Sequence, residues 1–209
     1  MLLDLWEIPL RCGVFGGSFD PVHLGHLILA DTALECAQLD RVLFMPVSTS
    51  PLKPDGPTAS NRQRVEMLQL ALGGNTALEL STLELDREGV SYTVDTLEAL
   101  RKERPDDEWF LIVGADSLED FGRWKNIERI CELAIPLVGA RRGSSADLDQ
   151  LSEYVSPDRL AEIRQYAFEF PAIEISSTRI RRRVADGRSI RYRLPRGVEQ
   201  YIHNAKLYL

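Results

Sequence analysis

Residues 13–26 read GVFGGSFDPVHLGH, an order that predicts a strand, a tight loop and the start of a helix. An apolar run leads into Gly16 and Gly17, where the backbone can approach a ligand closely because glycine has no Cβ atom. The chain then turns at Asp20-Pro21, since proline breaks a strand. We therefore expect a ligand to lie at the carboxyl end of the first strand.

Two histidines begin the helical pattern, which covers residues 23–39. His23 and His26 are three residues apart, so we expect them to share a face and to point together out of the first turn. That turn also has free N–H groups and the positive end of the helix dipole, which favour an anion. The loop and the helix start together predict a phosphate site with two imidazoles beside it.

Other motifs fit this stretch less well. Walker A would need a Gly-Lys-Ser/Thr ending, and the dinucleotide fingerprint would begin its helix where Asp20-Pro21 stands. A zinc site has few ligands to draw on, because the remaining histidine is His203 and Cys36 has no ligand-spaced partner. We expect no metal site built by the protein. The plain alternative, two solvated histidines at a helix start, does not account for the glycines and the turn.

The composition predicts one globular domain. The 209 residues are 44% hydrophobic, enough for one substantial core, and the net charge of −7 argues against nucleic acid or a membrane surface as a partner. Cys12, Cys36 and Cys131 are scattered, which suits buried free thiols in a reducing cytoplasm. Residues 1–10 are apolar but short and acidic; we interpret them as an N-terminal extension, neither a signal peptide nor a membrane span.

Apolar runs alternate with helix-period stretches, which predicts an α/β fold: a Rossmann-like, doubly wound parallel sheet with helices on both faces, in a single domain over 1–209. The expected strands are 11–15, 41–46, 77–80, 109–113, 135–140 and 166–171. The expected helices are 23–39, 60–72, 93–103, 127–133, 158–165, 177–185 and 197–207. Ligands bind beyond the carboxyl ends of such strands, where the loop over residues 16–21, here called the glycine loop, and residues 114–117 would lie. The proline-containing loop 48–57 is the candidate for a mobile flap.

A second set of donors begins at Ser176, Ser177 and Thr178, which would cap a helix, and eight arginines follow in residues 179–196. Hydroxyls, backbone N–H groups and a guanidinium on one turn can clamp a polyphosphate. We expect residues 176–209 to form C-terminal clamp helices. A solvated basic face is the plain alternative, and nucleic acid is a weak one because the rest of the chain is acidic.

These two motifs resemble the two signatures of the HxGH nucleotidyltransferase superfamily. Further segments are similar to bacterial nicotinate-nucleotide adenylyltransferases; they are SYTVDTL (91–97), FLIVGADS (110–117), Trp124 and PRGVEQYI (195–202). The resemblance covers all but the first ten residues. It implies adenylyl transfer from ATP to nicotinate mononucleotide, which gives nicotinate adenine dinucleotide and pyrophosphate in NAD biosynthesis. We expect a cytoplasmic enzyme with Mg²⁺ carried mainly by the ATP phosphates, and a homo-oligomer stays open.

Carried over residue by residue, the resemblance implies three sets of contacts. The catalytic set is His23, His26, Lys53 and Arg181. The ATP-binding set is Gly16, Gly17, Ser18, Phe19, Gly114, Ser176, Ser177 and Thr178. The mononucleotide-binding set is Tyr92, Thr93, Asp116, Trp124 and Arg141. Within that last set, Trp124 would stack on the pyridine ring, Asp116 would bind the ribose or the mononucleotide, and Arg141 would approach its phosphate. Without the resemblance, Trp124 and Tyr92 are best interpreted as packing residues, and Arg179, at a variable position, has no assigned role.

The chain departs from the family in the loop after the second expected strand. The family usually has Pro-Pro-His-Lys there, whereas residues 50–53 read SPLK. Leu52 replaces the imidazole, so its contact is not expected here and loop closure would rely on Lys53. Two alternatives stay open: a sister adenylyltransferase or cytidylyltransferase of the superfamily, and a nucleotide sensor without turnover. The segments 91–97 and 110–124 argue against the first, and the intact cation set argues against the second.

Overall fold

Six parallel strands form the central sheet of the computed structural model, which describes residues 8–48, 56–87, 89–118 and 120–209. The strands are β1 (Arg11–Gly17), β2 (Arg41–Pro46), β3 (Leu78–Leu80), β4 (Glu108–Gly114), β5 (Ile135–Arg141) and β6 (Phe168–Phe170). Their order is β3-β2-β1-β4-β5-β6, and Cys12 of β1 is in register with Arg41 of β2 and Trp109 of β4. The strand order therefore reverses between β1 and β4, the switch point at which such sheets bind ligands.

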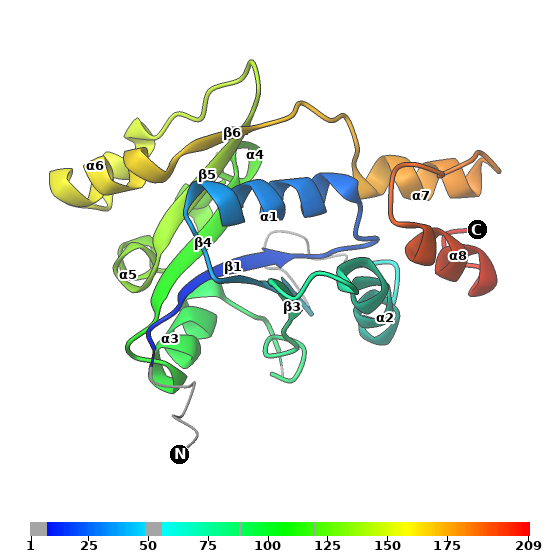
Figure 1. The fold of residues 1–209 in the computed structure, drawn as a ribbon, viewed down its shortest axis with the longest axis horizontal. Coiled ribbons are helices and arrows are strands. Elements are labelled where there is room, and N and C mark those ends of the chain that lie inside the picture. Colours follow the sequence, from blue (N-terminus) through cyan, green and yellow to red (C-terminus); the bar gives the residue numbers. More distant parts are fainter. Residues whose placement is uncertain (1–7, 49–55, 88, 119) are drawn as a thin grey trace.

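Helices cover both faces of the sheet, as Figure 1 shows for α1 and α3 on opposite sides of β1. The helices are α1 (Leu24–Cys36), α2 (Asn61–Leu72), α3 (Thr93–Glu103), α4 (Ala115–Leu118), α5 (Ile127–Leu133), α6 (Pro157–Tyr166), α7 (Ser177–Ala185) and α8 (Arg196–Asn204). Two short 3₁₀ turns cover Phe121–Arg123 and Asp149–Glu153. Burial on both faces explains the continuous apolar sequence of β4, in which Trp109 to Val113 are buried. The predicted fold class is confirmed.

The predicted elements agree with the structure to within a few residues, with three corrections. The first helix ends at Cys36 instead of residue 39, and His23 is its N-cap. The last helix ends at Asn204 instead of residue 207. The one-turn helix α4 and the two 3₁₀ turns were not predicted, because one turn is too short to show a helical period.

The free thiols differ in burial. Cys12 and Cys131 are buried as predicted, but Cys36, the last residue of α1, is exposed, so the prediction of buried thiols is wrong for it. Most of the loop 48–57 (residues 49–55) lies outside the described residues, and so does the extension over residues 1–7. No helix in the described part of the chain is long and apolar enough to cross a membrane.

Candidate active site

Open space lies against the carboxyl ends of β1 and β4. A Cβ atom added to Gly16, in β1, would meet no atom within 4 Å, and the same holds for Gly114, the last residue of β4. These glycines belong to neighbouring strands at the switch point. The missing side chains therefore leave room for a ligand to approach two strand ends at once.

The glycine loop is supported from beneath by Phe19. Its side chain is 1% exposed, and its backbone has a φ of 46°, in the left-handed region. A Cβ on Gly17 would lie 3.0 Å from this ring, so glycine is needed there for packing. Because the whole residue is buried, Phe19 acts in this structure by packing under the loop.

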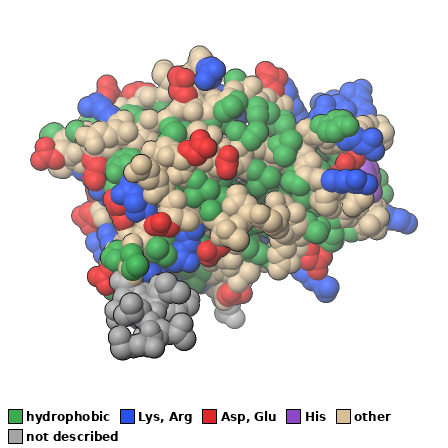
Figure 2. Space-filling view, in the orientation of Figure 1, with side chains coloured by type: hydrophobic (Ala, Val, Ile, Leu, Met, Phe, Trp, Pro, Cys, Tyr) green, Lys and Arg blue, Asp and Glu red, His purple; other side chains and the backbone are tan. Residues whose placement is uncertain are grey.

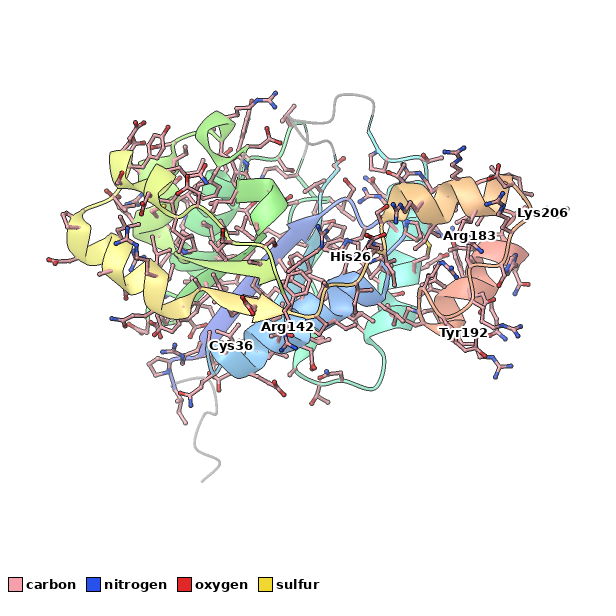
Figure 3. The ribbon with its side chains drawn as sticks, turned by 90° about the horizontal axis from the view of Figure 1, so that it is seen from above. His26, Cys36, Arg142, Arg183, Tyr192 and Lys206 are labelled. Atoms are coloured by element: carbon pink, nitrogen blue, oxygen red, sulfur yellow. The ribbon has the colours of Figure 1, made fainter. Side chains whose placement is uncertain are left out.

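The two histidines stack on each other at the start of α1. Their ring centroids are 3.6 Å apart with an interplanar angle of 16°, and the backbone N–H of His23 donates to Nδ1 of His26 at 3.2 Å. Gly25 permits this arrangement, since a Cβ there would lie 3.1 Å from the His23 ring. Figure 3 shows His26 beside the segment that leads into α7. The histidines do share a face, and His23 is the more buried of the two.

Burial separates the chemistry of the two imidazoles. His23 is 6% exposed, and burial lowers its pKa to about 4, so it is neutral at pH 7. His26 is half-buried, and its Nδ1 is an acceptor, which places the proton of the neutral ring on Nε2. The two rings therefore lie together, as expected, but His23, the N-cap of α1, is less accessible than His26.

The late hydroxyl-arginine turn meets the early turn directly. Ser177 Oγ donates to the Pro21 carbonyl at 2.9 Å, and Arg181 Nη1 donates to the Asp20 carbonyl at 2.6 Å. More than 150 residues separate each pair in the sequence. The tertiary structure thus joins the two predicted phosphate motifs at the carboxyl end of β1.

The other hydroxyl residues of this turn have different roles. Ser176 is the N-cap of α7, and its Oγ accepts from the Arg179 N–H at 3.3 Å. Thr178 is exposed. Of the eight arginines in residues 179–196, Arg181 makes the contact with the glycine loop, and five are exposed: Arg179, Arg182, Arg188, Arg191 and Arg196. The solvated-face interpretation therefore holds for most of them.

Asp20 organises the loop, a role that its position in the sequence does not reveal. Its carboxylate is 3% exposed and accepts from the Thr58 and Ala59 N–H groups at 2.7 and 3.1 Å, and from Tyr208 Oη at 2.7 Å. Arg181 Nη1 lies 3.7 Å from Oδ2. This side chain joins the glycine loop, the segment before α2 and the segment after α8.

Arg64 of α2 supports the same loop from the core. Its side chain is fully buried, and it donates to the Ser18 carbonyl at 2.8 Å and to Asn61 Oδ1 at 2.7 Å. Burial lowers the pKa of this guanidinium, while Asp20 opposes that shift. Arg64 lies three and four residues before the buried Met67 and Leu68, so the helical period puts it on the apolar face of α2. An arginine at such a position is a signal that the sequence contains.

The predicted mononucleotide residues lie in other loops along the same edge of the sheet. Tyr92 is the N-cap of α3 and Thr93 its first residue, and Lys125 Nζ lies 4.4 Å from the Tyr92 ring centroid. The adjacent Trp124 is half-buried against Phe121, and its Nε1 is buried without a hydrogen-bond partner in the described structure. A helix that follows a parallel strand begins at its carboxyl edge, so these residues lie on the side of the sheet where β1 and β4 end.

Three predicted site residues are less fully described. Arg141 is the exposed last residue of β5. Asp116 belongs to α4, but its side chain lies outside the described structure. Lys53, like Leu52, falls in the segment 49–55, outside the described residues.

The described residues contain no group of three or more His, Cys, Asp or Glu side chains suited to a metal ion. A separate groove of about 710 Å³ runs between the start of α1 and α8, lined by Leu24, Arg191, Tyr192, Leu194, Arg196, Glu199, Gln200 and His203. Figure 3 shows Tyr192 at the far end of the molecule from most of the sheet. The predicted site residues are not among its lining.

Comparison with known proteins relates this geometry to one family. The family model described as cytidylyltransferase-like matches residues 14–183. A "Probable nicotinate-nucleotide adenylyltransferase" of Rhodopirellula baltica is 46% identical over 94% of this chain and 92% of its own length. The protein of the same name from Thermus thermophilus is 45% identical over 95% of this chain and 100% of its own.

Solved structures show the same fold at low sequence identity. Nicotinic acid mononucleotide adenylyltransferase from Plasmodium falciparum, complexed with NaAD, superposes with a TM-score of 0.73 at 16% identity, over 95% of this chain and 97% of that one. The same protein complexed with APC gives a TM-score of 0.71 at 15% identity, with the same coverage.

Proposed function

This chain belongs to the nicotinate-nucleotide adenylyltransferases of the cytidylyltransferase-like family, and we propose that it transfers the adenylyl group of ATP to nicotinate mononucleotide. A phosphate oxygen of the mononucleotide attacks the α-phosphorus of ATP. The bond from that phosphorus to the bridging oxygen of the β-phosphate breaks, and pyrophosphate leaves. The product is nicotinate adenine dinucleotide, an intermediate of NAD biosynthesis.

The observation that carries this proposal is the contact between the two donor-rich turns. Arg181 and Ser177 reach the Asp20-Pro21 turn, so donors from both ends of the chain surround one strand end. A phosphate is already a nucleophile and needs no general base. The protein's work is therefore to align two anions and to stabilise the charge that develops on pyrophosphate.

The described donors suit that work. We propose that Nε2–H of His26 donates to an ATP phosphate, since Nδ1 is used as an acceptor. The neutral, buried His23 would hold that ring in place and offer a further contact. Arg181 would bind the departing polyphosphate, and Lys53 would add a cation from the loop before α2.

The open edge at Gly16 and Gly114 suits the adenosine part of ATP, while the hydroxyls of the α7 turn and the loop backbone suit its phosphates. The described residues offer no carboxylate cage, and Asp20 is already engaged by its donors. We therefore assign Mg²⁺ to the ATP phosphates, whose charge it would partly neutralise.

A pyrophosphate-release assay tests the proposed function. The protein is incubated with ATP and, in separate reactions, nicotinate mononucleotide, nicotinamide mononucleotide or phosphopantetheine. Release that depends on nicotinate mononucleotide supports the proposal. Release with phosphopantetheine alone indicates a sister transferase, and ATP binding without release in any reaction indicates a sensor.

Replacement of Trp124 by alanine tests the mononucleotide end of the site. Loss of stacking on the pyridine ring should raise KM for nicotinate mononucleotide by about tenfold, from an aromatic contact of roughly 1–1.5 kcal/mol, with KM for ATP little changed. Steady-state kinetics with each substrate varied in turn measure both. Equal effects on the two KM values would argue against stacking.

A further inference from the structure

The carboxylate of Asp20 is held by neutral donors. Oδ2 accepts from the Thr58 N–H, while Oδ1 accepts from the Ala59 N–H and from Tyr208 Oη. The carboxylate is 3% exposed, so it depends on these three bonds in place of water. Tyr208 is the one side chain among these three donors.

Arg181 lies next to this carboxylate without closing onto it. Its Nη1 donates to the Asp20 backbone carbonyl at 2.6 Å, whereas the distance from Nη1 to Oδ2 is 3.7 Å. A direct guanidinium–carboxylate hydrogen bond would be about 2.7–2.9 Å long. The side chain of Arg181 keeps 30% of its surface exposed. The guanidinium is thus held at the loop with donors left for an anion.

Tyr208 is built into the fold as a permanent donor. It follows α8, its ring packs against the core cluster, and its φ of 65° turns the backbone there. Burial and the adjacent Asp20 carboxylate raise the pKa of its hydroxyl, so the proton stays on Oη. The hydroxyl therefore always donates to Asp20 under the conditions in which an enzyme works.

We propose that Tyr208 is a positioning residue for adenylyl transfer: its hydroxyl satisfies Asp20 and thereby keeps Arg181 available to the polyphosphate of ATP. This inference rests on the proposed function. Arg64, the other nearby guanidinium, holds the Ser18 carbonyl with Nη1 and Asn61 with Nη2. Its Nε has no partner in the described structure, but turning this buried guanidinium towards Asp20 would release the glycine loop. Arg181 is the cation that an under-satisfied carboxylate would draw in.

The substitution Tyr208→Phe removes the hydroxyl and keeps the ring. With Oδ1 short of a donor, Arg181 should close the gap to the carboxylate and withdraw from the substrate. We expect kcat/KM for ATP to fall about tenfold, on the scale of losing part of one charge-assisted hydrogen bond, with KM for nicotinate mononucleotide changed less than twofold. Binding of inorganic tripolyphosphate, measured by calorimetry, should weaken by a similar factor.

Tyr201→Phe is the matched control. Tyr201 of α8 also donates its hydroxyl to a carboxylate, that of Glu66 in α2, which forms an ion pair with the exposed Arg62. Both variants lose one tyrosine–carboxylate bond from the same part of the fold, and urea unfolding compares their stabilities. If Tyr208 acts only through stability, two variants with the same free energy of unfolding should have the same kcat/KM for ATP. That result would overturn the proposal.

A double-mutant cycle shows whether Tyr208 acts through Arg181. In an Arg181→Ala background, Tyr208→Phe should leave kcat/KM for ATP unchanged within twofold, because no guanidinium remains to be withdrawn. A full tenfold effect in that background would overturn the proposal. An inactive wild-type protein would instead contradict the proposed function, and it would leave tripolyphosphate binding by the two tyrosine variants as the test of Tyr208.

Discussion

His26 shows how one hydrogen bond determines the chemistry of a side chain. The His23 N–H occupies its Nδ1, so the neutral ring carries its proton on Nε2, and the stacked His23 fixes the plane of the ring. Such a donor is pre-oriented before substrate binds, which is the condition for stabilising charge in a transition state.

We expect His26→Ala to lower kcat by ~10²–10³, the scale for losing one transition-state donor. The ring is half-buried, so the loss of stability should be modest. Pyrophosphate release at saturating ATP and mononucleotide measures kcat, and thermal unfolding monitors the fold. Turnover near the wild-type value would remove His26 from the catalytic set.

The buried His23 makes stability depend on pH. Its pKa of about 4 in the folded protein is below its ordinary value of 6.5, so between these values the unfolded chain binds a proton that the folded protein does not. The free energy of unfolding is therefore unaffected by the titration of His23 above pH 6.5, and it falls as the pH falls from 6.5 towards 4. From the size of the shift, the loss is on the order of 3 kcal/mol.

Urea unfolding at pH 7 and pH 4.5 measures this loss. Carboxylates titrate in the same range, so the informative quantity is the difference between variants. His23→Gln should show a smaller loss on acidification than the wild type. His203→Gln, which replaces an exposed histidine of α8, should match the wild type. Equal pH dependence in all three proteins would contradict the assignment.

The first turn of α1 depends on a glycine inside the helix. Gly25 is its second residue, and a Cβ there would come within 3.1 Å of the His23 ring, which is buried and cannot move aside easily. Gly197 occupies the same place in α8, but a Cβ there would meet Leu70 at an ordinary 3.5 Å.

We expect Gly25→Ala to displace the histidine stack and lower kcat by roughly tenfold, since misplacing a catalytic group by a fraction of an ångström is costly. Alanine favours a helix by about 0.5–1 kcal/mol over glycine, so unfolding stability should change little. Gly197→Ala should keep full activity. Kinetics and urea unfolding of both variants test this, and identical kinetics would show that the stack does not need glycine.

The molecule uses glycine for two opposite purposes along its central sheet. Gly114 faces open space at the end of β4, whereas a Cβ on Gly139 of β5 would lie 2.6 Å from Leu29 and 2.8 Å from Phe168. The first glycine leaves room for a ligand, and the second leaves room for the core. Activity and stability should therefore respond separately to substitution.

Gly114→Ala should raise KM for ATP on the order of tenfold, because the methyl group occupies space proposed for the nucleotide, while the free energy of unfolding stays within about 0.5 kcal/mol of wild type. Gly139→Ala should lower the free energy of unfolding by roughly 1–3 kcal/mol through overpacking. Kinetics and urea unfolding distinguish the two. Normal ATP kinetics for Gly114→Ala would place the nucleotide elsewhere.

Charge is also distributed unevenly over the molecule. Residues 174–209 contain nine Lys and Arg but three Asp and Glu, although the whole chain has a net charge of −7. Figure 2 shows the basic side chains gathered over the end formed by α7 and α8. Because α7 contacts the glycine loop at the switch point, these basic side chains create a positive potential near the proposed triphosphate site.

The sequence by itself determined the order of the elements and the chemistry of the two motifs. The spacing of apolar residues depends only on neighbouring positions in the sequence. The six strands and the bounds of α3, α5 and α7 could therefore be predicted from it. The glycine loop and the hydroxyl-arginine turn are also local, because each needs only neighbouring residues to present its donors.

Only the tertiary structure decided which distant groups meet. The contacts of Arg181 and Tyr208 with Asp20 span 161 and 188 residues, and no local pattern encodes them. Burial likewise made His23 neutral and put Arg64 in the core, since desolvation depends on everything packed around a group. Local periodicity reports what each segment can form, whereas contacts between distant segments determine the charge, orientation and availability of the side chains.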